Sequence, residues 1–172
     1  MQPNIIQMGR LFIAGKTGDG SKTHDVWNAF DRQYNQNPFP KTNGNGYEIR
    51  FWKSRVSGKK PNPQKTVHVG FAVDHAADAE GFEIITLPAA GYAVFDVCVA
   101  KGYDSENETM EKWLVEKAAE YRMLELDGFE YVVECYNEKF KGGNQPDSLV
   151  EIWIPIVLNT EHRARNSELR SF

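Results

Sequence analysis

Cysteine and histidine are scarce in this chain, which argues against two common kinds of site. Its 172 residues contain two cysteines, Cys98 and Cys135, far apart in the sequence, and four scattered histidines without an HxxxH spacing. A disulfide framework needs more cysteines, and a zinc site needs closely spaced cysteine or histidine ligands. We therefore expect two reduced thiols, no bound metal and no cofactor.

Long apolar runs and a large excess of one charge are also absent. No stretch approaches the roughly 20 apolar residues of a membrane span, and the first residues lack the charged and apolar regions of a signal peptide. Twenty basic and 24 acidic residues give a formal charge of −4. Without a basic field, a helix-turn-helix or a zinc-finger pattern, direct nucleic-acid binding is not expected. These absences predict a cytoplasmic protein that binds neither membranes nor nucleic acids.

Catalytic motifs are few. The glycine-rich segment 15–20 (GKTGDG) lacks the GxxxxGK[ST] order of a phosphate loop, and we interpret it as a hairpin turn. No GxSxG elbow occurs. The chain is therefore expected to bind rather than to catalyse.

The chain does contain two halves with the same order of elements. Apolar residues at helical spacing predict helices at 23–36 and 107–121, capped by Thr23 and by Ser105 or Asn107. Alternating or continuous apolar runs predict strands, at 5–14, 46–52, 66–73, 82–87, 91–100, 129–136 and 149–158. The GYEI segment at 46–49 resembles GFEY at 128–131, at an interval of about 82 residues.

Such a duplication predicts two units related by a pseudo-twofold axis, with a ligand cleft at their seam. We expect one domain over residues 1–158, made of halves 1–76 and 77–158, followed by a polar tail at 159–172. A basic loop at 53–65 is expected between two strands of the first half.

A carboxylate within an aromatic strand is the most informative feature. Glu134 lies in the run FEYVVECY at 129–136, where strand alternation puts it on one face with Val132 and Tyr136. Moving a carboxylate out of water is costly unless a cation or hydrogen-bond donors compensate. Glu134 therefore either faces solvent or has a cationic partner, which could be a ligand.

Five segments, in order, carry a family resemblance. They are VWNAF at 26–30, LPAAGYAVF at 87–95, the helix residue Trp113, ECYNEKF at 134–140 and VEIWIPI at 150–156. With these segments the chain resembles the GyrI-like, or bacterial effector-binding, family, whose members occur alone and fused to transcription regulators. Having no recognisable DNA-binding segment before Ile5, this chain is expected to act as a stand-alone binder.

The resemblance implies an α+β fold of tandem β-α-β-β (SHS2-like) repeats, with a curved antiparallel sheet, two helices and a central cleft. It implies that Glu134 pairs with cationic, hydrophobic, aromatic compounds of the multidrug type. Candidate aromatic walls are Tyr136, Trp153, Tyr92 and Trp52, and for Tyr92 and Trp153 a structural role is equally open. Trp27 and Trp113 are expected to pack in the core.

Two other functions stay open at this point. Some relatives open strained rings of toxins, and a buried Glu134 with a raised pKa could serve as a general base in such a hydrolase. The gyrase inhibitors of the family imply an adaptor that binds a protein through the basic loop or the tail. The chain is expected to be a monomer or a homodimer.

Overall fold

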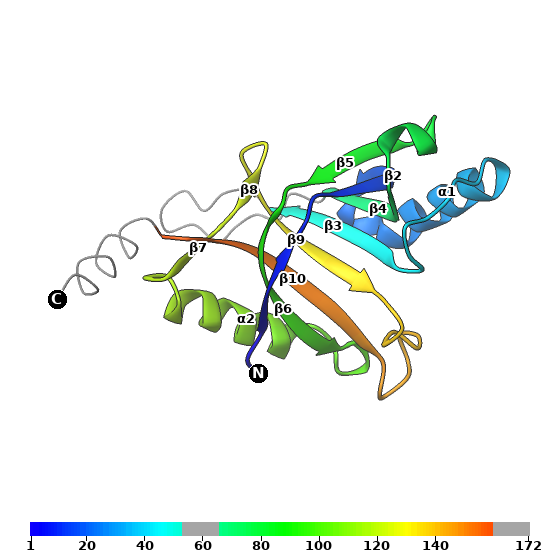
Figure 1. The fold of residues 1–172 in the computed structure, drawn as a ribbon. Coiled ribbons are helices and arrows are strands. Elements are labelled where there is room, and N and C mark those ends of the chain that lie inside the picture. The colour runs from blue at the N-terminus through cyan, green and yellow to red at the C-terminus, as the bar shows by residue number, and fades with distance from the viewer. Residues whose placement is uncertain (53–65, 160–172) are drawn as a thin grey trace.

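The computed structural model describes residues 1–52 and 66–159, and of Trp52 the backbone alone. The predictions made for the basic loop 53–65 and for the tail beyond Asn159 lie outside the described residues. The described strands form a single curled antiparallel sheet, whose order is β1-β6-β10-β9-β3-β4-β2-β5 (Figure 1). The bounds are β1 (Asn4–Met8), β2 (Leu11–Asp19), β3 (Gly46–Trp52), β4 (Thr66–Val73), β5 (Glu83–Leu87), β6 (Ala90–Cys98), β9 (Phe129–Tyr136) and β10 (Leu149–Leu158).

Two units of the same design build this sheet. The first is β2, helix α1 (Thr23–Gln36), β3 and β4; the second is β6, helix α2 (Asp104–Glu116), β9 and β10. The strand preceding each unit pairs with the first strand of the other unit, because β1 pairs with β6 and β5 pairs with β2. The units meet where β3 pairs with β9. The predicted α+β fold with two β-α-β-β repeats is confirmed.

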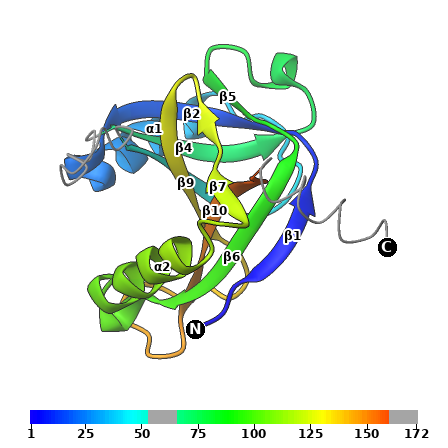
Figure 2. The ribbon, with the colours of Figure 1, turned by 90° about the vertical axis from the view of Figure 1, so that its left-hand side faces the viewer.

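Both helices lie on the same face of the sheet, each over its own unit (Figure 2). On α1, Val26 and Phe30 are buried against Val67 and Val69 of β4. On α2, Met110 and Trp113 are buried in the apolar cluster of β6 and β10. In each helix a few apolar side chains at helical spacing cover the sheet, while the polar side chains face water.

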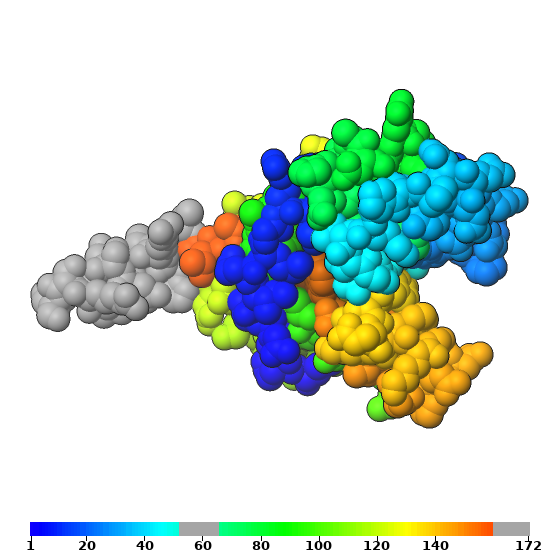
Figure 3. Space-filling view, turned by 45° about the vertical axis from the view of Figure 1, so that its right-hand side comes forward, coloured from blue at the N-terminus to red at the C-terminus, as the bar shows by residue number. Residues whose placement is uncertain are grey.

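The opposite, inward-curving face holds a second apolar core. Alternate residues of the central strands point there, and the largest are Tyr47, Tyr92, Tyr131 and Trp153. Figure 3 shows β1 (dark blue) lying across the molecule, and a notch between the segment before β3 (cyan) and the connection from β9 to β10 (yellow to orange). This notch lies at the end of the seam between β3 and β9.

Several local predictions were wrong. The segment 15–20 is not a hairpin turn, because β2 continues to Asp19 before a single 3-10 turn over Gly20–Lys22. Thr23 is the first residue of α1 rather than its cap, and its hydroxyl donates to the carbonyl of Gly20. Helix α2 begins at Asp104, so neither Ser105 nor Asn107 caps it. The run 5–14 contains two strands, and the short strands β7 (Tyr121–Met123) and β8 (Glu125–Leu126) have no counterpart in the prediction.

Candidate functional site

Two glutamates face each other across the seam between the units. Glu48 of β3 lies directly opposite Glu134 of β9 in the antiparallel register. Both are buried, with 4% and 7% of their surface exposed. Like charges placed directly opposite in a sheet repel each other, and burial increases the cost of each charge. The pair therefore needs a cation.

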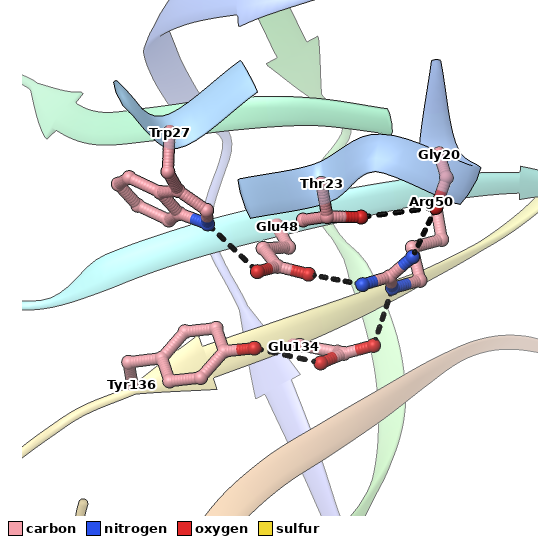
Figure 4. Close-up of polar contacts among 7 residues, drawn as sticks. All are labelled: Gly20, Thr23, Trp27, Glu48, Arg50, Glu134 and Tyr136. Carbon is pink, nitrogen blue, oxygen red and sulfur yellow. Dashed lines mark hydrogen bonds and ion pairs between the residues drawn. The ribbon is translucent and has the colours of Figure 1, made fainter. Parts of the chain in front are cut away.

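Arg50 supplies that cation from the same strand as Glu48 (Figure 4). Its Nε lies 2.5 Å from Oε1 of Glu134, and one of its terminal nitrogens lies 2.5 Å from Oε2 of Glu48. A single guanidinium thus bridges two carboxylates, and the three groups together carry a formal charge of −1. The Arg50 side chain is 28% exposed, against 5% and 9% for the side chains of Glu48 and Glu134, so the arginine is the most exposed member of the cluster.

The remaining carboxylate oxygens accept hydrogen bonds from aromatic side chains. The hydroxyl of Tyr136 donates to Oε2 of Glu134 at 2.9 Å, and the indole Nε1 of Trp27 donates to Oε1 of Glu48 at 2.7 Å. Strand alternation puts Tyr136 beside Glu134, and α1 brings Trp27 over β3. Every oxygen of the two carboxylates therefore has a partner within the protein.

The pKa values reflect both burial and charge. Burial raises the pKa of Glu134 above its ordinary value, Arg50 opposes this shift and the charge of Glu48 adds to it. For Arg50, burial alone would lower the pKa, but the carboxylates of Glu134 and Glu48 outweigh it and the pKa is raised. Burial and the same two carboxylates raise the pKa of Tyr103 to about 12. Tyr103, at the start of α2, is therefore part of the electrostatic environment of the site.

Aromatic rings with partly exposed surface surround the carboxylates. Trp27 contacts Tyr136 edge to face, with 6.4 Å between ring centroids, and Tyr136 contacts Phe140 in the same way at 4.9 Å. Trp27, Tyr103, Tyr136 and Phe140 are all half-buried. These rings come from α1, the start of α2, β9 and the loop after it, so both units contribute to the site. Rings of this kind attract cations held against their faces.

The structure brings together only part of the predicted site. Glu134 and Tyr136 are in contact on the helix-covered face, as the strand alternation indicated. Tyr92 and Trp153 are buried together in the core of the opposite face, with 6.0 Å between their ring centroids. For Trp52 the backbone pairs with Glu130 and the side chain lies outside the described part. A ligand that contacts Glu134 from the helix side does not reach Tyr92 or Trp153 without crossing the sheet.

Tyr92 and Trp153 have structural partners in that core. The hydroxyl of Tyr92 donates to the carbonyl of Pro88 at 3.4 Å and lies 3.3 Å from the hydroxyl of Tyr131. The indole of Trp153 donates to Glu151 at 2.9 Å. These contacts match the structural alternative that the sequence left open for both residues.

Sequence reasoning missed Glu48, Arg50 and Tyr103, and it assigned Trp27 to the core. The repeat comparison gives Glu48 and Glu130 as equivalent positions of the two units, and it does not show which residue lies across the strand pair from Glu48, which the register shows to be Glu134. An alternating Glu-x-Arg in a predicted strand was the available signal, because residues two apart share a face.

Other kinds of site find little support in the described ranges. Residues 1–52 and 66–159 contain no cluster of three or more histidine, cysteine, aspartate or glutamate side chains able to hold a metal. Nor is any helix in these ranges long and apolar enough to cross a membrane. A shallow cavity of about 370 Å³ lies between the end of α1 and the turn at 78–82, away from the carboxylates.

Comparisons with known proteins agree with this architecture. The chain resembles SAV2435, solved with bound tetraphenylphosphonium, with a TM-score of 0.60, 17% identity and coverage of 91% of this chain and 94% of that one. It resembles the C-terminal domain of EcmrR with a TM-score of 0.59, 15% identity and coverage of 91% and 97%. EcmrR in a DNA complex matches with a TM-score of 0.66 and 10% identity, over 90% of this chain and 57% of that one. A search of curated proteins found no match.

At these identities the structural matches establish the fold alone. A family model, the GyrI-like small molecule binding domain, matches residues 1–157. Because that match covers nearly the whole chain, this protein belongs to the GyrI-like family of small-molecule-binding domains.

Proposed function

We propose that this protein binds amphipathic, cationic, aromatic small molecules at the seam between its two units, with Glu134 as the ligand's counter-ion. The observation that carries the proposal is the imbalance of buried charge at the seam. Two buried carboxylates share one guanidinium, so the cluster keeps a formal charge of −1. A bound monovalent cation would bring that charge to zero.

The surroundings of the carboxylates support an aromatic cation rather than a metal ion. Trp27, Tyr103, Tyr136 and Phe140 offer half-buried ring surface around the charge. A delocalised cation loses less hydration on entering such a place than a compact one, and the rings add apolar contact and cation–π attraction. Flat rings and one charge accept many scaffolds, which suits a site of broad specificity.

The resemblance to SAV2435 supports the same class of ligand. That protein was solved with tetraphenylphosphonium, a monovalent cation whose charge is enclosed by four phenyl groups. Tetraphenylphosphonium is therefore the first probe to use with this chain.

The test is a calorimetric titration with tetraphenylphosphonium and with triphenylphosphine oxide, which keeps three phenyl rings without net charge. We expect micromolar binding of the cation and much weaker binding of the neutral compound. Glu134→Gln should weaken cation binding by about 1–3 kcal/mol, the range for a lost charge-assisted contact, and should barely affect the neutral compound.

Glu130→Gln is the matched control, because it removes a carboxylate from the same strand outside the Glu48–Arg50–Glu134 cluster. It should leave both affinities unchanged. Equal losses for the cation and the neutral compound in Glu134→Gln would refute the proposal, as would a wild-type protein that binds neither.

A further inference from the structure

The carboxylates and the guanidinium at the seam differ in exposure and in the length of the side chain that carries them. Glu48 and Glu134 project from adjacent central strands and are 4% and 7% exposed. Arg50 has a long side chain that is 28% exposed, and its contact with the Gly20 carbonyl is long, at 3.5 Å. The carboxylates are held in the sheet, whereas the long, partly exposed side chain of Arg50 can turn toward water, where its guanidinium regains hydration in place of the contact with Glu134.

Arg50 also occupies the position that a cationic ligand needs. Its Nε holds Oε1 of Glu134, and the hydroxyl of Tyr136 holds the other oxygen. A ligand cation added beside this arrangement would lie next to the guanidinium, where like charges repel. The ligand must therefore compete with Arg50 for Glu134.

We propose that Arg50 is an internal counter-ion that a cationic ligand displaces from Glu134, and that this exchange decides which cations the site accepts. The proposal rests on the function proposed above. In the exchanged state Arg50 keeps its contact with Glu48 and the ligand pairs with Glu134. Two carboxylates then face two cations, so the exchange neutralises the whole cluster and leaves no carboxylate unpaired.

Glu48 has a defined part in this exchange. Because it already holds a terminal nitrogen of Arg50, it retains the guanidinium after Glu134 is released. The indole of Trp27 fixes the other oxygen of Glu48, so this acceptor stays in place. Glu48 is thus a positioning residue, which acts on the ligand through Arg50.

The exchange makes selectivity depend on more than charge. A tethered arginine competes at the high effective concentration of an intramolecular group. A small cation such as tetramethylammonium brings a charge but little apolar surface, so it gains too little to displace Arg50. A cation with phenyl groups also buries apolar area against the surrounding rings, and this additional gain drives the exchange.

The test compares wild type, Glu48→Gln and the double variant Arg50→Gln/Glu48→Gln, using tetraphenylphosphonium and tetramethylammonium as probes. The double variant keeps the formal charge of −1 but frees Glu134 from its competitor. It should bind tetraphenylphosphonium about tenfold or more tightly than wild type, and its binding of tetramethylammonium should become measurable. Glu48→Gln leaves Arg50 with Glu134 alone, and it should bind tetraphenylphosphonium about tenfold more weakly.

Equal affinities of wild type and the double variant would overturn the exchange, because formal charge alone would then set the affinity. That result would leave the proposed function intact as long as Glu134→Gln still lost the cation. Failure of both wild type and the double variant to bind tetraphenylphosphonium would overturn both proposals. Thermal unfolding of each variant checks that it is folded.

A second measurement follows the contact in the wild type itself and uses only the conservative variant Arg50→Lys, for assignment. With isotope-labelled arginine, the Nε–H signal of Arg50, assigned by its loss in Arg50→Lys, reports the contact with Glu134. Saturation with tetraphenylphosphonium should shift this signal upfield and speed its exchange with water, because the contact is lost. A signal that keeps its position and exchange rate at saturation would overturn the displacement of Arg50.

Discussion

Glu48 and Glu134 are cross-strand neighbours in the register of β3 and β9, and the guanidinium of Arg50 joins them. Two apolar side chains at these positions would pack in the sheet without the free-energy cost of burying charge, and buried ion clusters often add little or nothing to stability. Stability alone therefore does not account for two buried glutamates at the seam of the two units. The proposed role in binding would account for them, because a cationic ligand would balance the remaining negative charge of the cluster.

Replacing Trp153 should separate stability from binding. Trp153 is 5% exposed and contacts Tyr47 and Tyr92 on the face opposite Glu134. Trp153→Phe should lower the free energy of unfolding by about 1–3 kcal/mol, because it leaves a gap and removes the donor to Glu151. The affinity for tetraphenylphosphonium should be unchanged. Urea unfolding and calorimetric titration check the two expectations. A variant of unchanged stability with weakened binding would instead place Trp153 in the ligand site.

Gly15 should be intolerant of any side chain. It lies opposite Gly70 in the β2–β4 pair, and a Cβ at Gly15 would come within 1.8 Å of the Val69 carbonyl oxygen. Gly15→Ala must therefore shift backbone, and we expect a loss of about 3 kcal/mol or more in the free energy of unfolding. Gly9→Ala is the matched control, since a Cβ there has no neighbour within 4 Å. Similar urea midpoints for the two variants would contradict the close approach of β2 and β4.

The repeated fold could be predicted because its signals are local. Strands 46–52, 66–73, 129–136 and 149–158 and helix 23–36 have the predicted bounds, since each carries its own apolar period and its own flanking turn residues. The short strands β7 and β8 were missed because they have two or three residues each and exist by pairing with β10 and β9. Their pairing depends on distant parts of the chain.

The site was only half predictable for the same reason. The contact of Tyr136 with Glu134 follows from alternation within one strand. The contact of Glu134 with Arg50 depends on how β3 pairs with β9, and so does the position of Glu134 opposite Glu48. Arg50 and Glu134 are 84 positions apart in the sequence. No local pattern fixes that register, so Arg50 could not be identified from the sequence as the partner of Glu134.

The pH dependence of cation binding follows from the raised pKa of Glu134. Burial is the main cause of the rise and Glu48 adds to it, while Arg50 and Tyr136 oppose it. A proton and a ligand cation compete for the same carboxylate. The affinity for tetraphenylphosphonium, whose own charge does not titrate, should therefore increase as the pH rises through the pKa of Glu134 and become constant above it.

Stability should change in the opposite direction over the same range. The folded-state pKa of Glu134 lies above the unfolded value of about 4.3, so the folded protein holds this proton more tightly than the unfolded chain. The stabilising contribution of this group is complete below the unfolded value and is lost as the pH rises through the folded value. Tyr103, with a pKa of about 12, stays protonated throughout and contributes to neither trend.

The difference between wild type and Glu134→Gln isolates these two trends from the contributions of other groups. Titrations and urea unfolding at several pH values between 4 and 8, a range set by the ordinary and raised values for a carboxyl group, measure both quantities. Relative to the variant, wild type should gain affinity and lose stability as the pH rises. If the affinity stayed constant while the stability rose with pH, Glu134 would be ionised throughout, and its burial would be compensated by Arg50 in full.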